Sequence, residues 1–160
     1  MYFNSLKIKN LRCFRETEIS LQHPDRQNSL KFPNINLLLG NNGSGKSSVL
    51  RALALSALSP ILERSSGLVL NRMVRNTVNT PNAKLEDTEL TADLILHEQD
   101  LQGFSRKKHL SLEMKSRIKR FGSIEELHSE TKIEQVPTGI FEDYSPAFLI
   151  VGYGVTRRVE

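Results

Sequence analysis

The residues with the clearest chemical meaning form a glycine-rich run in the first third of the chain. The run reads Gly-Asn-Asn-Gly-Ser-Gly-Lys-Ser-Ser and matches the phosphate-binding pattern G-x-x-x-x-G-K-[ST]. Its glycines let backbone N–H groups converge on one anion, while Lys46 can reach the β- and γ-phosphates and the Ser47 hydroxyl can ligate Mg²⁺. The sequence therefore predicts a site for ATP and Mg²⁺ at Gly40, Asn41, Asn42, Gly43, Ser44, Gly45, Lys46, Ser47 and Ser48.

Such a loop needs a strand before it and a helix after it. Residues 35–39 are a short apolar run, typical of a buried parallel strand. Residues 48–58 are mostly helix formers, with one apolar face made of Val49, Leu50, Leu53, Ala57 and Leu58. We expect this helix to end at Ser59-Pro60, or a new one to begin there. The motif alone would arise by chance in roughly 0.5% of chains of this length, and its context favours function.

The rest of the chain contains several segments in which apolar and polar residues alternate. Residues 6–9 and 18–21 predict β structure that leads into the glycine-rich loop. Residues 89–96 and 109–118 predict an antiparallel sheet with one solvated face. Residues 100–105 would form a turn, residues 123–128 a brief helical turn, and residues 146–151 another buried strand. The expected fold class is therefore α/β, with an antiparallel β portion beside a strand–loop–helix unit.

The predicted organisation is a single, partial domain over residues 1–160. Residues 1–62 would hold the first strands, the glycine-rich loop and the first helix. Residues 63–87, rich in polar side chains, would form a surface loop with a short element near residues 67–73. Residues 88–160 would hold the antiparallel segments and a final strand end.

Composition narrows the classes to which the chain can belong. A hydrophobic content of 38% and a mean hydropathy of −0.35 indicate a globular, rather polar protein, and no apolar run approaches the ~20 residues of a membrane span. The single cysteine, Cys13, excludes an internal disulfide and is expected to be buried or half-buried. With a site for ATP, it favours a reducing cytoplasm. The four histidines lack the spacing of zinc ligands.

The net charge of +4 permits nucleic-acid contact without requiring it. Basic residues gather at 105–109 and then at Lys115, Arg117, Lys119 and Arg120. They could bind DNA phosphates, or they could be the solvated face of a strand. Neighbouring acidic residues dilute the positive field, so we favour the solvated face.

The motif set resembles the N-terminal part of an ABC-type ATPase head. The relevant branch contains the SMC, Rad50, RecF and RecN proteins and the bacterial AAA ATPases of the overcoming-lysogenization-defect kind. Residues 6–14 are similar to the family's opening strand and basic-aromatic turn, and residues 35–50 to its Walker A region. Residues 151–157, Val-Gly-Tyr-Gly-Val-Thr-Arg, resemble a Tyr-Gly-x-x-Arg element near the family's Q-loop.

This resemblance implies a P-loop NTPase fold and two ATP molecules held between two protomers. The implied partners are ATP, a second protomer or the C-terminal half of the ATPase, and DNA, in DNA maintenance or anti-phage defence. Arg12 and Phe14 would lie near the base or α-phosphate, or else be an ordinary surface arginine and core phenylalanine. Tyr153 and Arg157 would face the γ-phosphate or Mg²⁺-bound water, or else belong to an ordinary strand end with a solvated arginine.

The family's signature loop, Walker B acid, D-loop and switch histidine have no counterpart in the sequence. We therefore expect a fragment of an ATPase, leave its catalytic residues unassigned, and leave open whether this chain hydrolyses ATP. Two alternatives stay open. One is a small-molecule P-loop kinase, and the other is a truncated module that binds nucleotide without turnover.

Overall fold

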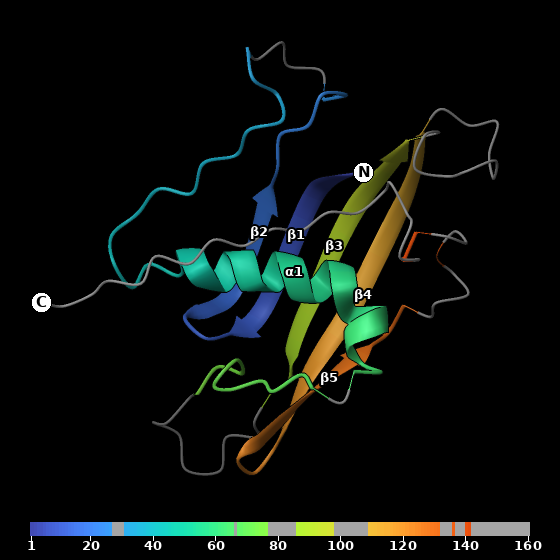
Figure 1. The fold of residues 1–160 in the computed structure, drawn as a ribbon. Helices are drawn as coiled ribbons and strands as arrows, with labels where there is room; N and C mark the ends of the chain where they lie inside the picture. Colours follow the sequence, from blue (N-terminus) through green and yellow to red (C-terminus); the bar gives the residue numbers. More distant parts are fainter. Residues whose placement is uncertain are drawn as a thin grey trace, which may run out of the picture.

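The computed structural model describes residues 1–26, 31–65, 67–76, 86–97, 109–131, 136, 140 and 141. Within these ranges the fold is α/β, with one helix lying across one face of a five-stranded antiparallel sheet (Figure 1). The elements are β1 (Tyr2–Leu11), β2 (Phe14–Ser20), α1 (Lys46–Leu62), β3 (Thr88–His97), β4 (His109–Phe121) and β5 (Ile124–Ser129). The strand order is β2-β1-β3-β4-β5, so the N-terminal strand lies inside the sheet.

The predicted alternation in the strands is confirmed. In β3, Leu90, Leu94 and Leu96 are at most 1% exposed and join the core, whereas Glu89 and Asp93 lie on the solvated side. Cross-strand pairing keeps the same side buried in neighbouring strands, as where Leu94 pairs with Leu112. The core therefore fills the space between the inner face of the sheet and α1.

The helix after the glycine-rich loop is also confirmed, although it runs past the predicted end to Leu62. Pro60 cannot donate to the Ser56 carbonyl, but the Ser59 hydroxyl donates to that carbonyl at 3.2 Å. The substitute bond allows the helix to continue. The predicted apolar face is only partly right, because Leu50 is 59% exposed. The leucines surround this helix, so their spacing alone did not reveal which side packs on the sheet.

The predicted strand at residues 35–39 is wrong in this structure, where the segment has no strand pairing. Ile35, Leu37 and Leu39 are 53%, 78% and 89% exposed, while Leu38 packs against the core. A strand needs a hydrogen-bonded neighbour, and no segment in the described ranges lies in register beside this one. Two hydrogen bonds between the Asn36 side chain and the backbone of Gln22 hold the segment instead.

The predicted helical turn at residues 123–128 is wrong as well, because this segment is β5. Phe121 pairs with Ile124 across the two-residue turn Gly122-Ser123, and Gly122 has φ +62°. A positive φ suits a tight hairpin turn, and glycine accepts it without strain. The predicted turn at residues 100–105 and strand at residues 146–151 lie outside the described ranges.

The segment from Leu68 to Asn76, here called the strap, is bridged to both β1 and β5. Val74 forms a bridge with Leu11 of β1, and Leu70 forms one with Glu125 of β5. The backbone N–H of Arg12 also donates to the Met73 carbonyl at 2.9 Å. The strap is therefore fixed to the sheet, where the sequence predicted a surface loop with one short element. No helix in the described residues is long and apolar enough to cross a membrane.

Candidate phosphate-binding site

The glycine-rich loop lies at the N-terminus of α1, with Lys46 as the first helical residue. The Lys46 ammonium donates to the carbonyl oxygens of Gly40 at 2.6 Å and Asn41 at 2.7 Å. The backbone N–H of Ser44 donates to the Asn41 carbonyl at 3.2 Å and closes the loop further. These contacts hold the positive charge of Lys46 against the loop that the sequence predicted as a phosphate cradle.

The N-terminus of α1 is open to an anion. Ser48 and Val49 donate their backbone N–H groups to the Gly45 carbonyl, at 2.9 and 3.0 Å. Within the described part of the chain, the N–H groups of Lys46 and Ser47 have no hydrogen-bond partner, no side chain caps the helix, and its first turn holds no acid. Unsatisfied N–H groups and the positive end of the helix dipole together attract phosphate.

Gly45 shows why the loop needs glycine at this position. Its φ is +93°, and a Cβ built there would lie 2.6 Å from Cζ of Phe14 and 2.7 Å from Sγ of Cys13. The turn between β1 and β2 is thus packed directly against the loop. The Phe14 ring contacts the loop glycine and the edge of the core, in agreement with its predicted orientation. Cys13 is exposed, so the prediction that it is buried or half-buried is wrong.

The residues present fit a nucleoside triphosphate with Mg²⁺. The free N–H groups and the Lys46 ammonium suit a polyphosphate, and the exposed Ser47 hydroxyl can offer Mg²⁺ one oxygen ligand. Mg²⁺ takes its other ligands from phosphate oxygens and waters in sites of this kind. Among the described residues, no cluster of three His, Cys, Asp or Glu side chains forms a separate metal site.

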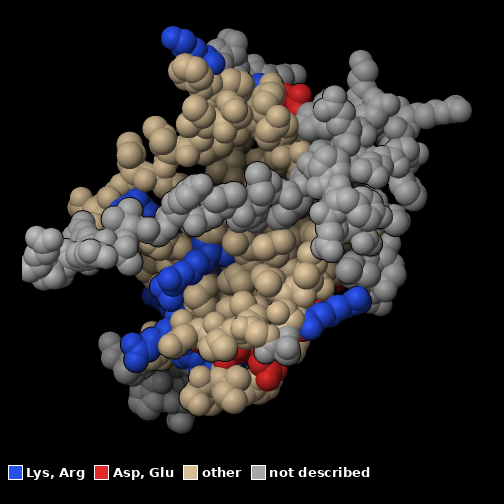
Figure 2. Space-filling model, viewed as in Figure 1, with Lys and Arg blue, Asp and Glu red and all other residues tan. Residues whose placement is uncertain are grey.

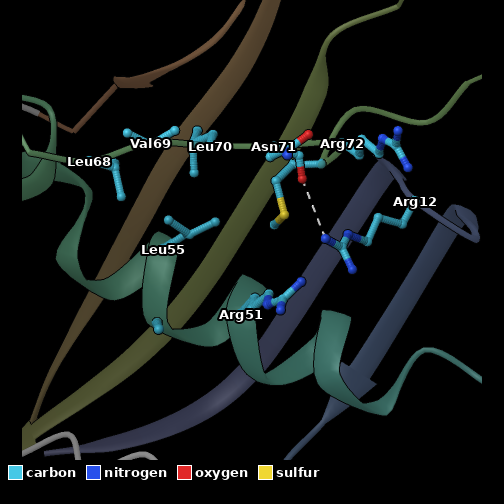
Figure 3. A pocket seen from close by; sticks show the side chains of 10 residues that line it. Arg12, Arg51, Leu55, Leu68, Val69, Leu70, Asn71 and Arg72 are labelled. Carbon is cyan, nitrogen blue, oxygen red and sulfur yellow. Dashed lines mark hydrogen bonds between the residues drawn. The ribbon is translucent and has the colours of Figure 1, made fainter.

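Of the other predicted site residues, Arg12 directs its side chain away from the loop, and the rest fall outside the described ranges. Arg12 lies in the β1–β2 turn, but its side chain points to the strap, where Nη2 donates to the Asn71 carbonyl at 3.4 Å (Figure 3). Tyr153 and Arg157 lie outside the described ranges. The structure therefore brings together the loop residues and the Arg12–Phe14 turn.

Three basic residues of β4, namely Lys115, Arg117 and Arg120, are paired with acids. Lys115 lies 2.6 Å from Glu113, a hydrogen bond that raises the pKa of Lys115, and Arg117 lies 2.9 Å from Glu130. Arg117 also forms an ion pair with Glu89 at 3.4 Å. This pattern agrees with the solvated strand face favoured from the sequence. The basic residues at 105–108 lie outside the described ranges.

Sequence reasoning missed a buried carboxylate at the start of β5. Glu125 is 6% exposed and accepts hydrogen bonds from the N–H groups of Met73 and Val74, at 2.7 and 3.2 Å. Arg120 lies 2.5 Å from the same carboxylate and donates to the Val74 carbonyl at 2.9 Å. A glutamate in a polar stretch carries no spacing signal for such a role, and only the fold places it under the strap.

Comparison with known proteins places this geometry in a family. The family model described as an AAA ATPase domain matches residues 1–97, which is more than half of the chain. A solved structure from work on ATP-driven dimerization and DNA-stimulated activation of SMC ATPases is 17% identical, with a TM-score of 0.49. That alignment covers 82% of this chain and 71% of the other. A search of curated proteins returned no match. The span of the family model includes β1, β2, the glycine-rich loop, α1 and β3, and the chain belongs to the AAA ATPase domain family.

Proposed function

We propose that residues 40–48 bind ATP with Mg²⁺, as the N-terminal half of an ABC- or SMC-like ATPase. The observation that carries this proposal is the uncapped N-terminus of α1, whose free N–H groups lie beside the Lys46 ammonium. Family membership supports ATP over other anions, and it favours an ATPase over a small-molecule kinase.

Each part of the loop has its own role in the proposal. Lys46 exchanges its two loop carbonyls for the β- and γ-phosphates, and backbone N–H groups of the loop hold the remaining phosphate oxygens. Ser47 offers its hydroxyl to Mg²⁺, which would supply charge neutralisation between the phosphates. Gly45 lets the loop approach the Cys13-Phe14 turn closely enough to fix the cradle.

The proposal extends to partners and location. Catalysis would require an acid, a signature loop and a water-orienting group from the C-terminal half of the ATPase or from a second protomer. DNA is a further partner in the proposal, for DNA maintenance or anti-phage defence. We also propose a cytoplasmic location, because the site would draw on cellular ATP and Cys13 is an exposed free thiol.

Calorimetric titration with Mg-ATP tests the proposal. We expect the wild-type chain to bind and Lys46→Ala to lose at least about 2 kcal/mol of binding free energy, since charge-assisted bonds to phosphate are lost. Lys7→Ala is the matched control, because it removes one exposed lysine from the polar face of the sheet. Binding that is unchanged in Lys46→Ala would refute the proposal. Phosphate release on the same samples then separates binding from turnover.

A further inference from the structure

A hollow of about 590 Å³ lies between α1 and the strap, outside the glycine-rich loop. Its volume falls within the range of small-molecule sites in proteins. Figure 3 shows the arrangement, with Arg51 rising from α1 and Arg12 reaching from the end of β1 beneath the strap. None of residues 40–48 lines this hollow, so it is distinct from the phosphate cradle.

The charged side chains that line the hollow are basic. Arg12, Arg51 and Arg72 line it, and among the described residues no acidic side chain does. In the described ranges none of the three arginines forms an ion pair, and the buried Nε of Arg12 has no hydrogen-bond partner. In the view of Figure 1, Figure 2 shows blue basic side chains beside α1, with red acidic side chains toward the lower and upper margins. Guanidinium groups without carboxylate partners are suited to a phosphate dianion.

The rest of the wall is apolar. Leu55 from α1 and Leu68, Leu70 and Met73 from the strap line the same hollow, and Leu55 lies below Leu70 in Figure 3. A free inorganic anion would leave this apolar wall in contact with water. A molecule with a phosphate at one end and an apolar or aromatic body at the other would use both parts of the lining.

The arginines are held in place by backbone geometry that costs free energy. Arg12 and Arg72 have φ values of +48° and +54°, in the left-handed region that side chains larger than glycine rarely adopt. The Arg12 N–H bond to the Met73 carbonyl and the Glu125 bonds to Met73 and Val74 maintain this geometry. The strain agrees with a functional demand on the positions of these two side chains.

We propose that this hollow is a second anion site that binds a phosphorylated small molecule with an apolar or aromatic body, independently of Lys46. The arginines bind the phosphate, and the leucine–methionine wall covers the body. The site is built from the β1–β2 turn, α1 and the strap, so it does not require the glycine-rich loop to be occupied.

Phenyl phosphate is a suitable probe, with inorganic phosphate and phenol as its two halves. The titration uses Lys46→Ala as background, so that the glycine-rich loop is silenced. We expect saturable one-to-one binding of phenyl phosphate, and weaker binding of either half. Adding Arg51→Ala and Arg72→Ala should weaken phenyl phosphate binding by about tenfold or more, since charge-assisted bonds are removed. Arg64→Ala is the matched control, because Arg64 is an exposed arginine just beyond α1 that does not line the hollow.

Three results would overturn the proposal. They are no saturable binding, binding that is lost in Lys46→Ala alone, and binding that the two arginine substitutions leave unchanged. Chemical denaturation of each variant shows whether the fold is intact, and Arg51→Lys adds a variant that keeps the charge but loses the planar fork. The difference in Mg-ATP binding between the wild type and Lys46→Ala reports on the glycine-rich loop separately, so either site can fail without the other.

Discussion

At the residue scale, Gly45 meets two requirements, one on its backbone conformation and one on the space beside its Cα. Its left-handed backbone opens the loop, and its missing side chain admits Phe14 and Cys13 from the β1–β2 turn. Gly43 has φ +84° but open space around it, and Gly122 in the β4–β5 hairpin is similar. Comparing substitutions at these three glycines therefore distinguishes the cost of backbone strain, which all three share, from the cost of steric overlap, which applies only at Gly45.

We expect Gly45→Ala to abolish ATP binding and to destabilise the fold more than Gly43→Ala or Gly122→Ala. The strain of a left-handed alanine costs about 1–2 kcal/mol, and all three substitutions share it. Only the methyl group at residue 45 also overlaps Phe14 and Cys13. Urea denaturation and Mg-ATP titration measure the two effects. Equal destabilisation at residues 45 and 122 would show that the contact with the turn does not matter.

The loop could be identified from the sequence because phosphate binding itself requires this spacing of glycine, lysine and serine. Lys46 and Ser47 could be assigned roles without knowing any tertiary contact. The arginines of the second hollow had no such signal, since Arg51 and Arg72 line one hollow only once the strap lies beside α1. For Arg12 the sequence left open a contact with a nucleotide or an ordinary surface position, and in the structure its side chain points to the strap.

At the element scale, the strap depends on the carboxylate of Glu125. Burial acts to raise the pKa of Glu125, but hydrogen bonds from Met73, Arg120 and Val74 outweigh it and lower the pKa below its ordinary value of 4.5. The folded state thus prefers the charged form more than the unfolded chain does. The resulting stability is fully present above pH 4.5 and is lost as the pH falls through the lowered value.

We expect Glu125→Gln to cost about 3 kcal/mol at neutral pH, because it leaves Arg120 without its buried partner. The difference from the wild type should shrink as the pH falls from 4.5 through the lowered pKa of Glu125, since the wild-type carboxylate becomes protonated over that range. Glu126→Gln is the matched control on the same strand, because Glu126 is exposed. Urea denaturation at several pH values measures both variants. A difference that persists undiminished at low pH would contradict this role of the Glu125 charge.

The strands show where the alternation of apolar and polar residues is enough to predict a strand and its buried face, and where it is not. β3 and β4 were predictable because one face is buried and the other solvated along most of their length. β5 begins with Ile124-Glu125-Glu126, where the buried residue is the glutamate and the isoleucine is 61% exposed, so the pattern is inverted. The apolar run at residues 35–39 reads as a strand, but pairing depends on a neighbour that no local pattern reveals.

At the scale of the whole molecule, residues 35–39 leave apolar side chains on the surface. Leu37 and Leu39 point away from the core, while Leu38 between them packs against it. Exposed apolar side chains on an unpaired extended segment favour contact between chains.

We expect Leu37→Ser with Leu39→Ser to reduce concentration-dependent association without lowering the free energy of unfolding. Leu38→Ser should do the reverse and destabilise the fold, because this side chain packs against the core. Sedimentation velocity over a range of concentrations measures association, and urea denaturation measures stability. Association that is unchanged in the double variant would show that other surfaces drive it.

The strand order also determines the order in which parts of the chain can fold. β1 and β2 can form a hairpin early, but β1 takes its other neighbour from β3, where Ile8 pairs with Leu90. The phosphate loop and its helix lie in the interval that this pairing must close, and such non-local closure is slow. During synthesis the loop therefore leaves the ribosome before the strands that support α1. Anion binding should emerge only once β3 and β4 have been made, so a nascent chain ending before residue 88 carries the motif without the site.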